Sequence, residues 1–511
     1  MAPYTTSPEF INVYESDERD NSIATASFVV NSSTPSAPGD AKKIKATLPE
    51  YHTAPPWRLL WDDLMLFIKC GLALPMIVFP LWYRPRRERT NYPKLDKQWV
   101  PKYILWGPID RAITGFQSWF QDVVDPFFPS GEMDELYPSM GNLICLAAHG
   151  TLIVSQLTFL LSLPFVATLP FHLFLPYVIS FVALNYFACY PLNAGTENGL
   201  LRSEHKSWPE AAHWPSLHPD REYKEEWIFL NGVSVGKHWL QGNLNRLSRT
   251  FHRPITGVHN KTSGIIFDTI QCLLERCFYF GTTDTRKCYA LIAAALNPEL
   301  KREKVVLILH SQGGLQGSLI LDWLLAHYSR ATLKKLEIYT FGNAANHFNN
   351  PEINDNEHVV GHIEHYGNAG DFVSQWGVLH FKRQVAKSRK HDHGKDRLRL
   401  MPIVGNILGL DKRQNTFFGR VFINKKWGHM LNQHYLDRIF PLNADLTAVE
   451  ETKGRPTPRS FLDSHMRSGR GLSKHDGEKV WKTSKLWKYI NGKEPEGESS
   501  AAMVNGDNGS H

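Results

Sequence analysis

Residues 304–314 read KVVLILHSQGG, an apolar run that ends abruptly in His310, Ser311 and two glycines. An amphipathic segment, residues 315–328, follows immediately. A short apolar run bounded by turn residues is typical of a buried strand, and the segment after it is typical of a helix. The stretch therefore predicts a strand–turn–helix unit with Ser311 on a tight turn, which is the setting that exposes a nucleophilic serine.

The residues two places before and two places after Ser311 bear on whether so tight a turn can form. Backbone segments come close together there, so small residues are expected at both places. Gly313 meets this expectation, whereas Leu309 stands where a glycine is usual. The alternative interpretation is a glycine-rich turn between a strand and a helix, in which the serine is incidental.

The sequence on both sides of this unit repeats the alternation of strand and helix. Short β-rich runs are separated by helix-like segments; the runs are WIFLNGV (227–233), LEIYTFG (336–342), HVVGHIEHYG (358–367) and VFINK (421–425). Such alternation indicates βαβ units, with right-handed crossovers that place helices on both faces of a largely parallel sheet. We therefore expect an α/β catalytic domain over residues 223–445.

A nucleophilic serine needs a base, and the base needs an orienting carboxylate, in the chain order Ser, Asp or Glu, His. Asp371 follows a predicted strand that ends at Tyr366, so it falls at the edge where parallel sheets place their sites. Glu364, inside that strand, is the weaker candidate. The alternative for Asp371 is a plain turn residue, because Gly-Asp pairs favour turns.

The candidate base is a histidine after the last predicted strand. His429 falls in a loop that follows Trp427 and Gly428, from which a side chain can reach back over the sheet edge. His434 lies in the helix-like segment that follows and is the second candidate. Loop position favours His429.

Two backbone N–H groups should stabilise the negative oxygen of the reacting ester. The residue after the nucleophile, Gln312, supplies the first. The second is expected after Asn231 and Gly232, where the glycine allows close backbone approach, so that Val233 or Ser234 donates. We favour Val233. The alternative is a simple Asn-Gly turn at the end of a strand.

Taken together, these motifs resemble the α/β-hydrolase superfamily and, within it, fungal-type lipases and serine esterases, with features similar to class 3 lipases. The resemblance rests on LHSQGG (309–314), FLNG (229–232), YTFGN (339–343), NAGDFV (368–373) and Gly428-His429. It covers residues 225–443, departs at Leu309 and at Asn231, where many members have histidine, and implies acyl-ester chemistry without giving the substrate.

An uncharged block precedes this domain. Residues 136–196 contain no Asp, Glu, Lys or Arg. Two apolar stretches of about twenty residues, 143–163 and 171–190, are separated by Pro164 and Pro170, and each is long enough to cross a bilayer. We expect a transmembrane helical hairpin over 141–192, with a pair of buried core helices as the alternative.

A further apolar stretch covers residues 64–83, but it contains Lys69, Pro75 and Pro80. A membrane span and an interfacial or re-entrant segment are equally compatible with it. The basic run RPRRER (84–89) comes next and favours the cytoplasmic side. We therefore expect a multi-pass membrane protein whose catalytic domain faces the cytosol.

The remaining regions are expected to lack a core of their own. They are a disordered N-terminal tail (1–56), a membrane-proximal region (57–140), a linker (193–222) and a mobile charged C-terminal tail (446–511). The 511 residues carry 57 Lys and Arg against 50 Asp and Glu, an excess too small and too scattered for nucleic-acid binding. The six cysteines show no zinc-ligand spacing, so we expect reduced thiols and neither metal nor cofactor.

The sequence thus favours a membrane-anchored serine hydrolase that cleaves lipid-like carboxylic esters through Ser311, Asp371 and His429 and an acyl-enzyme. Two alternatives stay open: an acyltransferase with the same triad, and a catalytically silent membrane scaffold that keeps the fold.

Overall fold

The computed structural model describes residues 55–82, 123–204, 224–354, 357–381, 417–458, 460–466 and 477–495. All of them belong to one compact unit, Leu48–His511. The predicted N-terminal tail lies outside the described residues except for its last two positions. The basic run at 84–89 also lies outside them.

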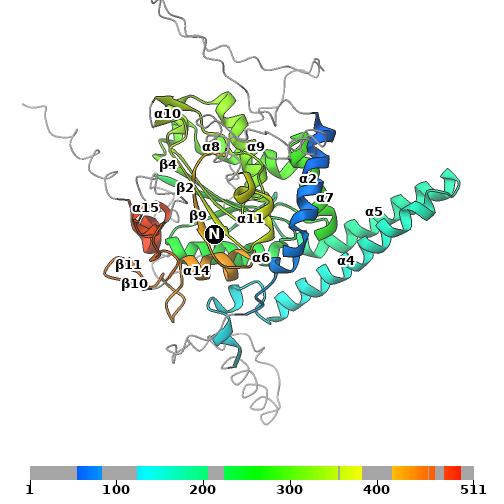
Figure 1. Cartoon of the computed structure of the whole chain (residues 1–511), viewed down its shortest axis with the longest axis horizontal. Coiled ribbons are helices and arrows are strands. Elements are labelled where there is room, and N and C mark those ends of the chain that lie inside the picture. The colour runs from blue at the N-terminus through cyan, green and yellow to red at the C-terminus, as the bar shows by residue number, and fades with distance from the viewer. Residues whose placement is uncertain are drawn as a thin grey trace, which may run out of the picture. The chain divides into compact units, whose positions relative to one another are not determined.

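A seven-stranded sheet organises the domain (Figure 1). Its spatial order is β1 (Leu200–Arg202), β3 (Thr256–Val258), β2 (Glu225–Leu230), β4 (Lys304–His310), β5 (Leu336–Phe341), β8 (His362–Asn368) and β9 (Arg420–Asn424). Only the β1–β3 pair is antiparallel, and every other neighbouring pair is parallel. The predicted α/β fold with a mostly parallel sheet is confirmed.

The order of the strands creates a switch point between β2 and β4. The chain leaves β2 toward β3 through α6 (Lys237–Phe251), and then returns past β2 to β4 through α7 (Ile265–Phe278) and α8 (Thr283–Ala295). Leu230 pairs with Leu309, so the carboxyl ends of these two strands lie side by side. Open α/β sheets place their sites in the crevice at such a point.

Alternate residues of each strand point to opposite faces of the sheet and pack into two separate hydrophobic cores, one on each face. Phe229 and Ile308 face α6, whereas Leu230 and Leu309 face α8 and α9 (Gln312–His327). Helices on both faces, as predicted, therefore cover the sheet. Shorter helices complete the domain: α10 (Arg330–Leu333), α11 (Phe372–Trp376), α14 (Asp437–Ile439), α15 (Val480–Thr483), the 3₁₀ helices η2 (Asp125–Phe127), η3 (Gly131–Met133), η6 (Pro298–Leu300) and η8 (Leu486–Gly492), and the π-helix η7 (Leu431–Leu436). Two small antiparallel pairs join β6 (Glu352–Asn354) with β7 (Glu357–His358) and β10 (Glu451–Thr452) with β11 (Arg455–Pro456).

Leu309 fits before the tight turn because the residue that packs against it, Gly317 of α9, has no side chain. It is fully buried, and a Cβ placed on Gly317 of α9 would lie 2.3 Å from Leu309 Cδ1. Close packing between β4 and α9 is thus obtained by a glycine in the helix rather than one in the strand.

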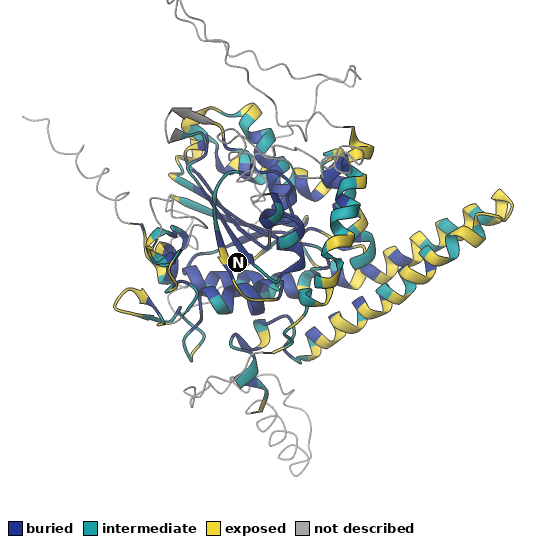
Figure 2. Cartoon of the chain, in the orientation of Figure 1, coloured by how far each residue is buried: buried dark blue, intermediate teal, exposed yellow. Residues whose placement is uncertain are grey.

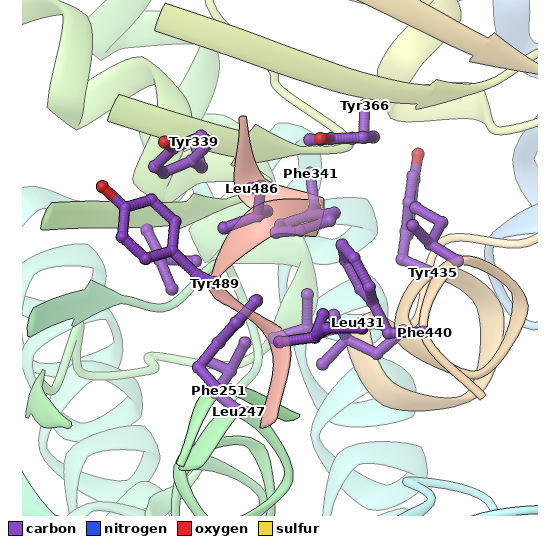
Figure 3. Close-up of a cluster of buried hydrophobic side chains, with 14 of the residues drawn as sticks. Leu247, Phe251, Tyr339, Phe341, Tyr366, Leu431, Tyr435, Phe440, Leu486 and Tyr489 are labelled. Carbon is purple, nitrogen blue, oxygen red and sulfur yellow. The ribbon is translucent and has the colours of Figure 1, made fainter. Parts of the chain in front are cut away.

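The predicted mobile tail from residue 446 is wrong for the part that the structure describes. Leu462, Leu486 and Tyr489 are fully buried in the core on the α6 face. Figure 3 shows Leu486 and Tyr489 packed among Tyr339, Phe341 and other core side chains. These apolar residues are interleaved with lysines, so the segment shows no apolar run of its own and resembles a tail in sequence. The α/β domain therefore extends beyond residue 445.

The predicted linker 193–222 also contributes to the fold. Its residues Leu200–Arg202 form β1, the antiparallel edge strand, and Leu200 pairs with Val258. Residues 205–223 lie outside the described chain.

The uncharged block forms two long helices, α4 (Met140–Val166) and α5 (Phe171–Asn193), which are long and apolar enough to cross a membrane. Figure 2 shows that they are largely exposed over most of their length. The alternative of two buried core helices is therefore not supported.

Residues 64–83 do not form one membrane-length helix. Helix α2 (Pro56–Cys70) ends at Cys70, and the turn η1 (Gly71–Ile77), which contains Pro75, follows it. Within α2, the buried Asp63 forms an ion pair with Arg276 of α7, at 3.0 Å between Oδ2 and Nε. The segment is thus fastened to the domain, and a single transmembrane span over 64–83 is ruled out for its described part, up to residue 82.

Replacing Asp63 by alanine should destabilise the protein strongly. Arg276 is fully buried, and removing its partner leaves an uncompensated buried cation, a change that costs about 3–5 kcal/mol. Thermal unfolding of the purified protein measures the loss. The control is Glu303→Gln, which removes an exposed partner of Lys224 and should leave the midpoint nearly unchanged. Equal shifts for the two variants would contradict the assigned role of the Asp63–Arg276 pair.

Candidate active site

Ser311 sits on the turn between β4 and α9 in a backbone conformation that side chains rarely adopt, with φ +59° and ψ −122°. Its N–H donates to Phe341 O at 3.0 Å, and its own carbonyl accepts from Gly314 and Ala344. These bonds hold the strained turn in place, and strain of this kind clusters at functional sites.

Two glycines make room for the turn. A Cβ on Gly232, in the loop after β2, would lie 2.4 Å from Ser311 Cβ and 2.9 Å from its Oγ. A Cβ on Gly313 would lie 2.4 Å from Leu230 O. The loop after β2 therefore passes directly against the serine hydroxyl, as expected for an oxyanion loop.

The structure brings Ser311, His429 and Asp371 together. His429 Nε2 lies 2.8 Å from Ser311 Oγ, and His429 Nδ1 lies 2.9 Å from Asp371 Oδ2. A carboxylate only accepts hydrogen bonds, so Nδ1 carries a proton, and when the ring is uncharged Nε2 accepts from the serine. His429 occupies the loop between β9 and η7, as the sequence predicted.

Asp371 is held by more donors than the histidine alone. It is fully buried and begins α11; its Oδ2 also accepts the hydroxyls of Tyr435 at 2.6 Å and Ser374 at 2.9 Å. Burial acts to raise the pKa of Asp371, but the charge of His429 and the hydrogen bonds from His429, Tyr435 and Ser374 outweigh it and hold the pKa below its ordinary value. The carboxyl is therefore ionised at neutral pH. Tyr435 and Ser374 had not been predicted.

Further contacts position the base. The ring of His310 stacks on that of His429, with centroids 4.7 Å apart, and His310 Nε2 lies 2.9 Å from the backbone oxygen of His429. Gly342, at φ +56°, leaves room on the other side, since a Cβ there would lie 2.8 Å from His429 Cε1. Both residues were part of the motifs in the sequence, but their contacts depend on the fold.

His434, the second candidate base, is engaged elsewhere. Its Nδ1 accepts from the N–H of Met430 at 3.0 Å, which leaves Nε2 as the donor to Pro80 O at 2.9 Å. Burial lowers its pKa to about 3. The structure thus places His429, and not His434, against the serine hydroxyl. Glu364, the weaker acidic candidate, accepts bonds from Tyr366 and from the backbone of Lys485, away from His429.

Stability should fall as the pH is lowered below about 6.5, in part because of His310 and His434. Burial lowers the pKa of each from 6.5 to about 3, so between these values the unfolded chain binds protons that the folded chain does not. Each should contribute a slope of about 1.4 kcal/mol per pH unit in this window. Thermal unfolding from pH 7 to pH 4 should therefore be less pH-dependent for His434→Gln than for the wild type. Identical slopes would contradict the buried neutral state of His434.

The two predicted oxyanion donors flank Ser311. Gln312 opens α9, and Val233 follows Gly232. The N–H of Ser234, the alternative to Val233, donates to Asp268 Oδ2 at 2.9 Å and is therefore engaged. Within the described chain, the N–H groups of Gln312 and Val233 have no hydrogen-bond acceptor. Both N–H groups are therefore available to a further acceptor.

A buried polar network fixes both oxyanion segments. The Gln312 side chain donates to Glu275 at 3.0 Å and accepts from Asn260 at 2.7 Å. Asn260 in turn exchanges bonds with Asn231, since its N–H donates to Asn231 Oδ1 and its carbonyl accepts from Nδ2. Burial raises the pKa of Glu275 to about 6. The pairing of these four residues joins distant parts of the chain, so no local pattern indicated it.

The site is closed by the N-terminal segment. Ser311 is only 3% exposed. Ile77 of η1 accepts the N–H of His429 through its carbonyl at 3.1 Å, and its side chain packs in a cluster with Val233, Phe372 and Trp376. This segment, here called the cover (residues 56–82), therefore packs against the residues around Ser311.

No group of three or more His, Cys, Asp or Glu side chains in the described residues is arranged to hold a metal ion. The six cysteines are all free thiols. Comparisons of the chain with protein-family models, with curated proteins and with solved structures gave no match.

Proposed function

We propose that this protein is a membrane-anchored serine hydrolase of the α/β-hydrolase type that cleaves lipid-like carboxylic esters. The observation that carries the proposal is the continuous chain of contacts Ser311–His429–Asp371, at 2.8 and 2.9 Å, on a strained turn at the switch point of a parallel sheet. The closure of the site against water and the apolar cluster around it suit an apolar acyl chain.

In the proposed mechanism, Ser311 Oγ attacks the ester carbonyl while His429 Nε2 takes its proton. Asp371 stabilises the resulting imidazolium, and the N–H groups of Gln312 and Val233 bind the oxyanion. Collapse of the tetrahedral intermediate breaks the ester C–O bond, and His429 returns the proton to the departing alcohol. A water molecule, activated by His429, then attacks the acyl-enzyme and releases the acid and the free serine.

Helices α4 and α5 support the membrane part of the proposal. Both are long, apolar and exposed, and they form a hairpin whose two ends return to the same domain. The basic run at 84–89 favours a cytosolic position for this domain. Tethering raises the rate of encounter with substrates that partition into the same bilayer.

Product analysis tests the reaction class. The purified full-length protein in nanodiscs is given long-chain esters in water enriched in oxygen-18, with and without added long-chain alcohol. Hydrolysis predicts a released acid that carries the heavy isotope whether or not the alcohol is present. A new ester of the added alcohol would instead indicate an acyltransferase. Turnover of short polar esters alone would contradict the lipid-like substrate, and absence of any turnover would favour a silent scaffold.

A further inference from the structure

Helix α7 buries all three of its charged residues and exposes two large apolar ones. Asp268, Glu275 and Arg276 are buried, whereas Ile270 is 39% and Phe278 is 36% exposed. A helix on the surface of a protein in water shows the opposite arrangement, with its apolar stripe toward the core. The outer side of α7 therefore suits an apolar medium.

Helix α2 packs Leu59 and Phe67 inward, but it also buries a charged residue and exposes three large apolar ones. Asp63 is buried in its ion pair with Arg276, whereas Trp57, Trp61 and Ile68 are more than half exposed. The spacing of four and seven residues places these three side chains on one side of the helix. Leu72, at the start of η1, continues the stripe and is 94% exposed.

The two exposed stripes are joined. The rings of Trp57 and Phe278 meet edge to face with centroids 5.4 Å apart, and the Asp63–Arg276 pair lies beneath them. We define the α2–α7 face as Trp57, Trp61, Ile68, Leu72, Ile270 and Phe278. Figure 2 shows exposed residues along α2 and along the α4–α5 hairpin, and Figure 1 shows α7 beside both.

The other end of α7 is fastened to the hairpin. Phe267 packs edge to face on Phe159 of α4 and Phe181 of α5, with centroid distances of 6.3 and 6.0 Å. The side chains of Gln156 and Asn185, buried in otherwise apolar helices, donate to Ser263 O at 2.6 and 3.0 Å. A hydrogen-bonded joint therefore fixes the α2–α7 face relative to the hairpin.

We propose that the α2–α7 face is a second membrane contact, which lies in the interfacial layer of the same phospholipid bilayer that the hairpin enters. Tryptophan is enriched at that depth, and exposed Arg58 and Lys69 at the edges of α2 can reach the headgroups. The basic run that follows the cover in sequence complements anionic lipids. The face lies partly on the helix whose other end contacts the hairpin, so one bilayer can cover both without a protein partner.

This inference rests on the proposed insertion of the hairpin but not on the proposed chemistry. The cover includes Trp57, Trp61 and Trp82, and its Ile77 accepts a hydrogen bond from the backbone of His429. If the α2–α7 face lies in lipid, the cover therefore lies at the membrane surface. An ester in that leaflet would then approach Ser311 without crossing bulk water.

Spin-label accessibility tests the contact in the full-length chain, reconstituted in vesicles of phosphatidylcholine and phosphatidylserine. The most exposed native thiol, Cys70, is replaced by serine, and a label is placed through Trp61→Cys or Leu72→Cys. Leu161→Cys, exposed on α4, reports insertion of the hairpin, and Leu300→Cys is the matched control, an exposed leucine in η6 outside the face. Collision rates with oxygen, which partitions into lipid, and with a neutral nickel complex, which stays in water, are compared.

We expect labels at 61 and 72 to collide more with oxygen than with the nickel complex, as the label at 161 does, and the label at 300 to show the reverse. If the labels at 61 and 72 collided more with the nickel complex while the label at 161 collided more with oxygen, the α2–α7 face would not be a membrane contact, but the hairpin would still be inserted. If the labels at 61 and 72 were shielded from both reagents, a protein partner rather than lipid would occupy the α2–α7 face, and the proposed membrane contact would be wrong. A water-like result at 161 would remove the anchor and the contact together, and it would leave the serine chemistry standing.

Discussion

Ser311→Ala is expected to lower turnover of a carboxylic ester by about 10⁶-fold, because no other group in the site can form the acyl-enzyme. His429→Ala should have an effect of the same size, since the serine hydroxyl is a weak nucleophile without the base that contacts it at 2.8 Å. Combining the two substitutions should add little, because residues that act as a unit do not contribute independently. Initial rates with a chromogenic long-chain ester measure all three variants.

Two controls separate chemistry from folding in this experiment. Ser318→Ala removes a buried serine on the same helix, α9, whose hydroxyl donates to Leu315 O, and His434→Gln removes the histidine that donates to Pro80. Both should keep most of the activity. A Ser311→Ala protein with activity close to that of Ser318→Ala would show that another group is the nucleophile, and an inactive but folded His434→Gln would favour the second candidate base.

Asp371→Asn should lower kcat by about 10⁴-fold while the protein stays folded. The amide would present a donor to His429 Nδ1, so the ring would turn to the tautomer whose proton points at Ser311 and could no longer accept the serine proton. The loss should appear in kcat rather than KM, because Asp371 does not touch the substrate. Thermal unfolding measured alongside verifies that the fold is retained.

Ser374→Ala is the matched comparison for this variant. It removes one of the hydrogen bonds to Asp371 Oδ2 but leaves those from His429 and Tyr435. Its effect on kcat should therefore be far smaller than that of Asp371→Asn. Comparable losses for the two would indicate that packing around the carboxyl, rather than its charge and acceptor geometry, governs activity.

The elements with strong local signals were predictable from sequence. The apolar run at 304–310 had to be a buried strand, and the order of Ser311, Asp371 and His429 relative to the strands placed all three at one edge of a parallel sheet. Their observed distances follow from topology, because the carboxyl ends of parallel strands meet.

Features that depend on partners far away in sequence were not predictable. The space for Leu309 comes from Gly317, His434 donates to the carbonyl of Pro80, and the Gln312 side chain is held by Asn260 and Glu275. None of these long-range pairings produces a periodic pattern in the sequence.

Apolar composition alone was also a poor guide in both directions. Residues 64–83 are apolar enough to suggest a span, but Pro75 and the ion pair of Asp63 produce a bent segment fastened to the domain. The segment around Leu486 and Tyr489 is rich in lysine, yet those two side chains complete the core. In both cases tertiary contacts outweigh the local average.

The most direct test of the central claim is covalent labelling of the full-length protein with a fluorophosphonate, read by intact mass and peptide mapping. We expect one adduct on Ser311 in the wild type and in His434→Gln, none in Ser311→Ala, and strongly slowed labelling in His429→Ala. Undiminished labelling of Ser311→Ala, or no labelling of the folded wild type in its bilayer, would contradict it.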